Sequence, residues 1–409
     1  MRWLGRHERG ATMMGTPMLR NTQTGIVLWL ALFLLSGMAG VMLYIAHGTD
    51  PARQRAMQKT VAALAMAKQA LLAYAQQPLG LTQCELNCPR PGDLPCPDRN
   101  NDGIAETSCS NTARLGRLPW KTLGMGDVRD GSGERLWYAV SERYKNNPRL
   151  RPLNLDTAGT WSVASSQGVI WDATQGNGVV AVVIAPMQPL MREDGWVQQR
   201  QEATTELAKH YLDLNGVIDH AAPQEAALLG FVMAPNSIHF NDVVLPITAS
   251  QMHQVMQKQV LAEVKRSLRC VALPCNSYPS PASYEDSSCL GNLPLNAGQC
   301  LSVATSIGRL PLDVNAHWSW AVQHLLDGHP QHHWFQQNGW REQVFYVPGQ
   351  SQTSIIVAGE RLSGQVRDAT TDKLHLRAYL EASTLLTLHV QEAALNVQSN
   401  DMLDRVSRP

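Results

Sequence analysis

The chain has 409 residues and 34 basic against 34 acidic side chains, so its formal net charge at pH 7 is zero. It therefore lacks the basic surplus typical of nucleic-acid binding, and no nucleic-acid partner is expected. Charged residues make up 17% and hydrophobic residues 44% of the chain. This composition excludes a disordered protein, and the length allows two or three domains.

An uncharged apolar run comes first, from Gly25 to Ala46. It has about the length that a membrane-spanning helix needs. We expect residues 1–25 to be a cytoplasmic leader and residues 26–48 to be a transmembrane helix. The alternative is a signal peptide cleaved near Gly37-Met38-Ala39.

The next segment, 52–77, contains no Pro or Gly and has a helical apolar stripe. The stripe consists of Met57, Val61, Leu64, Leu71 and Ala75. Together with the apolar run, it predicts one long helix over residues 26–77, half in lipid and half packed on a domain.

Eight cysteines follow in two groups of four: Cys84, Cys88, Cys96 and Cys109, then Cys270, Cys275, Cys289 and Cys300. An even number without paired Cys-x-x-Cys spacing favours disulfides over zinc sites. Disulfides place everything after residue 48 outside the cytoplasm. The pairing remains open.

Two stretches repeat one order of features. Each has a helix, four cysteines, Gly-Arg-Leu-Pro (at Gly116 and Gly308), an aromatic strand, an apolar strand and a Tyr-Leu-acidic triplet (at Tyr211 and Tyr379). The helix at 251–269 has its own apolar face, formed by Met252, Met256, Val260, Val264 and Leu268. We expect a tandem duplication, with a first module at 49–249 and a second at 250–409.

Several strands are predicted from apolar runs. Val179 to Ala185 is uninterrupted and should be central and buried on both faces. Shorter strands are expected at 136–140, 231–234, 243–248, 344–347 and 354–358. Each module should therefore be a helix leading into a mainly antiparallel sheet.

A basic leader ending at Gly25, an apolar helix beginning at Ile26, Pro51 near its midpoint and a following sheet domain resemble type IV pilins and type II secretion pseudopilins. The stretch 91–141, with Leu94-Pro95-Cys96-Pro97-Asp98 and Leu136-Trp137-Tyr138, resembles proteobacterial prepilin-like proteins. The resemblance implies an α+β fold: an N-terminal transmembrane and long amphipathic helix followed by two pilin-like helix-plus-antiparallel-sheet modules. It also implies processing between Gly25 and Ile26.

One departure bears on the expected role. Major pilins carry Phe and Glu where this chain has Ile26 and Leu30. In lacking that Glu, the chain resembles the tip-type minor pseudopilin. The implied role is structural: a single-pass subunit of the bacterial inner membrane, mostly periplasmic, serving a type IV pilus or type II secretion-like system. Its partners would be other pilin-like subunits, contacted through the transmembrane helix.

Asp98, Asn100 and Asp102, followed by Gly103, match the start of a calcium-binding loop, and Glu106 adds a carboxylate. Position twelve of the loop is Cys109 rather than Glu, so an Asx-rich turn is the alternative. Calcium is the one candidate cofactor.

Other features suggest alternatives to a structural role. His317, His324, His329, His332 and His333 would suit a transition metal, although their polar surroundings favour a solvated loop. The many tryptophans would suit a periplasmic ligand-binding protein or adhesin, although core packing is their commoner use. No hydrolase, metalloprotease or nucleotide-binding motif occurs, and we expect no enzymatic activity.

Overall fold

The structure is a computed structural model. It describes residues 51–77, 89–110, 114–150, 152–200, 207–268, 280–292, 296, 298–311, 333–349, 352–381, 384 and 400–407. Residues 55–409 group into one compact unit.

The first described helix, α2, spans Pro51–Ala75. Pro51 is tolerated in its first turn because amide groups there have no partner within the helix. Leu64, Leu71 and Ala75 of the predicted stripe are buried, which confirms the face of the helix that packs inward. Lys68 reaches across this face and donates to the carbonyl of Pro246, 3.4 Å away.

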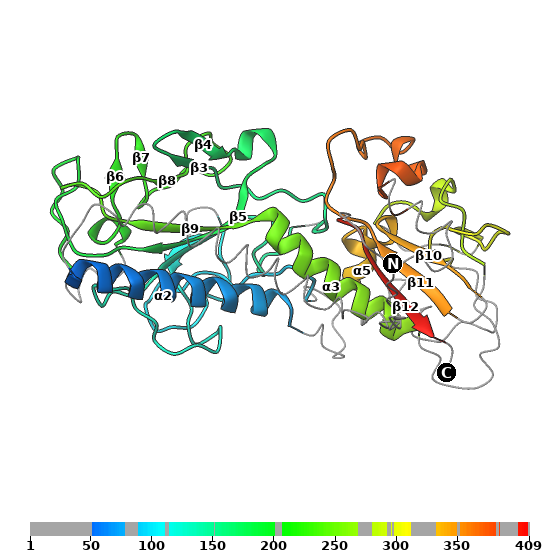
Figure 1. The fold of residues 1–409 in the computed structure, drawn as a ribbon, viewed down its shortest axis with the longest axis horizontal. Coiled ribbons are helices and arrows are strands. Elements are labelled where there is room, and N and C mark those ends of the chain that lie inside the picture. The colour runs from blue at the N-terminus through cyan, green and yellow to red at the C-terminus, as the bar shows by residue number, and fades with distance from the viewer. Residues whose placement is uncertain are drawn as a thin grey trace, which may run out of the picture. The chain divides into compact units, whose positions relative to one another are not determined.

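The first sheet has the order β1-β2-β5-β9 and is antiparallel throughout. Its strands β5 and β9 are labelled in Figure 1. Its strands are β1 (Leu115–Arg117), β2 (Trp137–Val140), β5 (Val179–Ala185) and β9 (Val243–Thr248). Every residue of β5 is buried, so the prediction of a central strand is confirmed.

The two faces of this sheet are covered by different layers. Tyr138 and Val140 of β2 face the core formed with α2, and Trp137 and Ala139 face the opposite core. The opposite core includes a small sheet of order β4-β3-β8, formed by β3 (Val163–Ser165), β4 (Gly168–Trp171) and β8 (Phe231–Met233). A two-stranded ribbon, β6 (Leu214–Asn215) with β7 (Ile218–Asp219), follows β5 in the chain.

Helix α3 (Ala249–Leu268) continues directly from β9. Thr248 and Gln251 form a reciprocal N-terminal cap: the amide of Gln251 donates to Thr248 Oγ1 at 3.3 Å, and the amide of Thr248 donates to Gln251 Oε1 at 3.1 Å. All five residues of the predicted apolar face are buried, so this prediction is confirmed.

The second sheet has the order β10-β11-β12 and is antiparallel. Its strands are β10 (Val344–Val347), β11 (Gln352–Val357) and β12 (Met402–Ser407). A short helix, α5 (His333–Gln337), precedes β10. Short 3-10 turns lie at Ala173–Gln175, Ala208–His210, Ser287–Cys289, Trp340–Glu342, Asp372–Leu374 and Leu376–Ala378.

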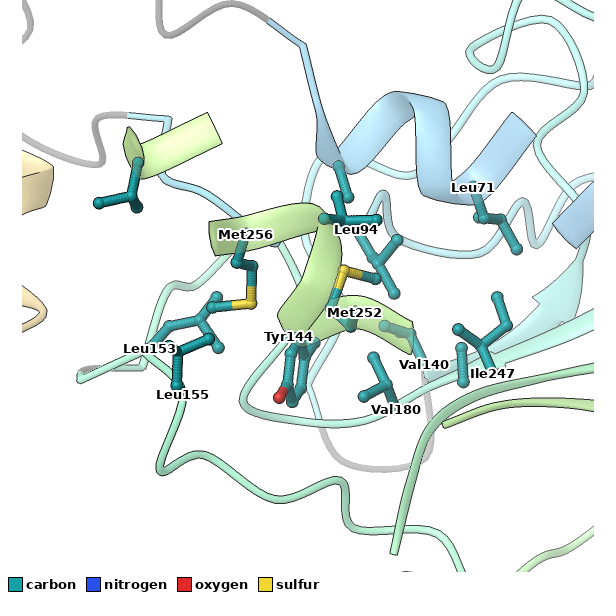
Figure 2. Close-up of a cluster of buried hydrophobic side chains, with 14 of the residues drawn as sticks. Leu71, Leu94, Val140, Tyr144, Leu153, Leu155, Val180, Ile247, Met252 and Met256 are labelled. Carbon is teal, nitrogen blue, oxygen red and sulfur yellow. The ribbon is translucent and has the colours of Figure 1, made fainter. Parts of the chain in front are cut away.

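One core runs beneath both sheets. Figure 2 shows Met252 and Met256 of α3 among Leu71 of α2, Val140 and Ile247 of the first sheet. The same core contains Tyr346 and Ile355 of the second sheet. Helix α3 therefore supports both sheets at once.

The expected fold class is wrong. The described residues form a mixed, sheet-rich α+β fold with three α-helices, and none of them is long and apolar enough to cross a membrane. Residues of both helix-plus-sheet parts belong to one core. The physical reason is that α2 is amphipathic: it buries one stripe and exposes its first residues, including Arg53 and Arg55. The predicted span at 26–48 and the processing residues Gly25 and Ile26 lie outside the described residues.

Candidate functional site

The described residues contain two disulfides. Cys96 pairs with Cys109, and Cys289 pairs with Cys300, with Cα atoms 5.6 and 4.7 Å apart. The prediction of disulfides is confirmed for these four cysteines. Cys84, Cys88, Cys270 and Cys275 lie outside the described residues.

The Asp98 loop is a tight turn whose oxygens accept backbone amides. Asp98 Oδ1 accepts from Asn101 at 2.6 Å, and Oδ2 accepts from Gly103 at 2.7 Å. Asp102 Oδ1 accepts from the amide of Ile104. Burial raises the pKa of Asp98, against the effect of these hydrogen bonds.

The remaining predicted ligands bond in the same way. Asn100 Oδ1 accepts from the amide of Asp102, and Glu106 Oε1 accepts from the amide of Arg99. These contacts are those of an Asx-rich turn. In the described ranges, no group of three or more His, Cys, Asp or Glu side chains is placed to hold a metal ion.

The repeated Gly-Arg-Leu-Pro marks the same local structure in two places. Gly116 pairs with Tyr138 and Gly308 pairs with Tyr346. Glycine is required in both because an added Cβ would lie 2.6 Å from the carbonyl oxygen of Asp98, or 1.8 Å from that of Ala282.

The arginines of the two motifs are buried against aromatic rings. The Arg117 guanidinium lies 3.8 Å from the ring centre of Tyr211 and 4.4 Å from that of Trp137. Arg309 lies 5.8 Å from the ring of Tyr379 and 5.6 Å from that of Phe345. Burial lowers the pKa of Arg117 to about 10, so this side chain remains cationic at neutral pH and gains from the π-faces beside it.

A buried carboxylate cluster that the sequence alone did not indicate begins two residues after Tyr211, at Asp213. Asp213 Oδ2 accepts from the amides of Asn241 at 2.7 Å and Asp242 at 3.0 Å. Asp242 Oδ2 accepts from the amide of Asp213 and lies 2.8 Å from His220 Nδ1. His220 Nε2 accepts from the amide of Val232, so Nδ1 carries the proton that it donates to Asp242.

Electrostatics in this cluster are dominated by burial. Burial, and then the charge of Asp242, raise the pKa of Asp213 to about 8. Both carboxyl groups are enclosed by the fold. The cluster therefore holds the turn before β9 in place, and no substrate reaches it in this conformation.

A second cluster has the same construction before β12. The amide of Asn400 donates to Glu381 Oε1 at 2.6 Å, and the amide of Glu381 donates to Asp401 Oδ2 at 2.9 Å. Burial raises the pKa of Asp401. The Asn-Asp pair preceding each edge strand is the sequence signal that would have identified both clusters.

The predicted ligand-binding residues are mostly used in the core or lie outside the described residues. Trp137, Trp161, Trp334 and Trp340 are buried, as expected for core packing, whereas Trp196 is 40% exposed. His317, His324, His329 and His332 lie outside the described residues, and His333 opens α5.

The exposed face of α2 is mainly apolar between Lys59 and Ala73. It consists of Ala62, Ala65, Met66 and Ala73, with the polar Gln69 among them, opposite the buried stripe. Met66 is 51% exposed. No charged residue lies between Lys59 and Lys68. Small and unbranched side chains of this kind allow a second helix to approach closely.

No protein-family model, characterised protein or solved structure matches this chain.

Proposed function

We propose that this protein is a structural, pilin-like subunit that acts outside the cytoplasm, in an assembly of the type IV pilus or type II secretion kind. The disulfides support an oxidising compartment, because such bonds rarely persist in the cytosol. The buried carboxylate clusters and the Asp98 turn stabilise the fold. The proposal therefore rests on a surface of the described residues, the exposed face of α2.

The exposed face of α2 carries this proposal. A helix that covers a sheet with one face and presents Ala62, Met66 and Ala73 with the other is suited to pack against a helix of a neighbouring subunit. The exposed Lys59 lies near this strip, whereas Lys68 lies on the inward side of the helix and donates to Pro246. In the assembly, neighbouring subunits would bury the apolar strip that one copy leaves open.

The test is Met66→Glu in the full chain, expressed in cells that assemble it. A charge at the centre of a helix–helix contact is costly to bury, so incorporation into large assemblies, measured by sedimentation, should fall about tenfold or more. The matched control is Val169→Glu, at an apolar position of β4 that is 37% exposed. Thermal melting of both variants checks that they fold.

Met66→Glu that sediments like the unsubstituted chain would contradict the proposal, as would an unsubstituted chain found only as a monomer. The proposal also includes cleavage of the leader after Gly25. Mass spectrometry of the mature protein should then find Ile26 as the first residue, whereas a chain beginning at Gly40 would contradict this step.

A further inference from the structure

A groove of about 390 Å³ lies between α3 and β12. Its lining comes from one helix face and one strand: Lys258, Leu261, Ala262, Lys265 and Arg266 of α3, with Met402 and Asp404 of β12. The helix residues are spaced by three, four, seven and eight positions, so they share one face. Met402 and Asp404 are two apart in the strand and share its corresponding face.

The groove has an apolar floor and a charged rim. Leu261 is buried and Met402 is half-buried, so an apolar side chain that entered would find apolar neighbours. Lys265 pairs with Asp404 at 2.6 Å, and Arg266 pairs with Glu263. Lys258 is exposed and makes no ion pair with any described residue. With three cations against two carboxylates, the rim favours an acidic occupant.

The backbone of β12 provides a second set of binding groups beside the groove. All six of its residues pair with β11 on one side. Within the described part of the chain, no strand pairs with its other side. An edge strand of this kind presents alternate amide and carbonyl groups that can bond an added strand.

We infer that this groove binds an extended peptide of a partner protein, which adds to the free edge of β12 and carries apolar and acidic residues two positions apart, so that both face α3. Its apolar side chains would pack on Leu261 and Met402, and an acidic side chain would meet Lys258. The free edge favours a peptide over a lipid or a small anion, because only a peptide uses the backbone groups. This inference does not depend on the proposed packing of α2.

The test uses the oxidised full chain and a fluorescein-labelled peptide, Ser-Val-Ser-Glu-Ser-Val-Ser, with blocked ends, whose Val and Glu side chains share one face of an extended strand. Fluorescence anisotropy should show saturable binding. Lys258→Glu should weaken binding about tenfold because it replaces attraction with repulsion. Lys258→Gln should give a smaller loss, which guards against misfolding of the charge reversal. The matched control is Lys59→Glu, an exposed lysine of α2, which should bind like the unsubstituted chain.

Asp404→Asn supplies a test in the opposite direction. It removes the carboxylate in the groove and releases Lys265, so binding of the acidic peptide should strengthen severalfold. A peptide methylated on its three central amide nitrogens cannot pair with a strand edge and should not bind.

Three results would overturn the inference. The first is no saturable binding of the acidic peptide. The second is equal binding of the methylated peptide, which would exclude strand addition. The third is displacement of the peptide by phosphatidylglycerol vesicles that bind in a Lys258-dependent way, which would assign the groove to an anionic lipid.

Discussion

At the residue scale, buried polar side chains fix the two turns that lead into the edge strands β9 and β12. Asp213 and Asp242 lie 29 positions apart, yet the backbone amide of each donates to the carboxyl group of the other. Glu381 and Asp401 lie 20 apart, and the amide of Glu381 donates to Asp401 while the amide of Asn400 donates to Glu381. Burial raises the pKa of Asp213 and of Asp401, so the proton affinity of these two carboxyl groups is linked to folding.

Asp213 should make stability depend on pH. The pKa of its carboxyl group is about 8 in the folded chain, against 3.8 as the ordinary value. The folded state therefore retains a proton that the unfolded state releases. The resulting stabilisation is complete below about pH 4 and is lost as the pH rises through about 8. Melting temperature should fall between these limits.

Asp213→Asn removes the titrating group, so the melting temperature should become less dependent on pH over this range. Asp172→Asn is the matched control, because Asp172 caps an exposed 3-10 turn. Calorimetry across the pH range measures both. A variant at 213 with the same slope as the unsubstituted chain would show that another group carries the dependence.

At the element scale, each disulfide closes a short loop beside a Gly-Arg-Leu-Pro turn. Cys96 and Cys109 are 13 residues apart, and Cys289 and Cys300 are 11 apart. The Asp98 turn lies inside the first loop and bridges to Arg117. The loops carry little regular structure. Each disulfide stabilises its loop mainly by reducing the conformational freedom of the unfolded chain.

Replacing Cys96 and Cys109 together by Ala should lower the free energy of unfolding by about 3 kcal/mol, the value expected for a loop of this length. The pair at 289 and 300 should give nearly the same loss, since the effect varies only with the logarithm of loop length. Guanidinium denaturation measures both. Losses below about 1 kcal/mol would mean that the loops are held by their hydrogen bonds instead.

The elements were predicted well where the signal is local. The apolar face of α3 and the central strand β5 follow from periodicity and from an uninterrupted apolar run. The pairing of cysteines, the Asp213 cluster and the groove beside Lys258 depend on residues far apart in the chain. Spacing cannot show which of them meet, and the Asp98 motif fits a metal loop and a turn equally well as a sequence.

At the scale of the whole molecule, the largest core of the described residues contains side chains of both sheets, α2 and α3. Met252 and Met256 belong to the same core as residues of both sheets, and the division into two modules stays a prediction. This core holds α3 in place. Two surfaces remain as candidates for binding partners: the exposed face of α2 and the groove beside β12. The proposed structural role depends on the first of these.

The most direct test is to place a photo-crosslinking amino acid at position 66 in the full chain in assembling cells. The proposed role predicts covalent products with pilin-like subunits or with a second copy, and few products from the same group at position 169. Equal yields at both positions, or no product at 66, would contradict it.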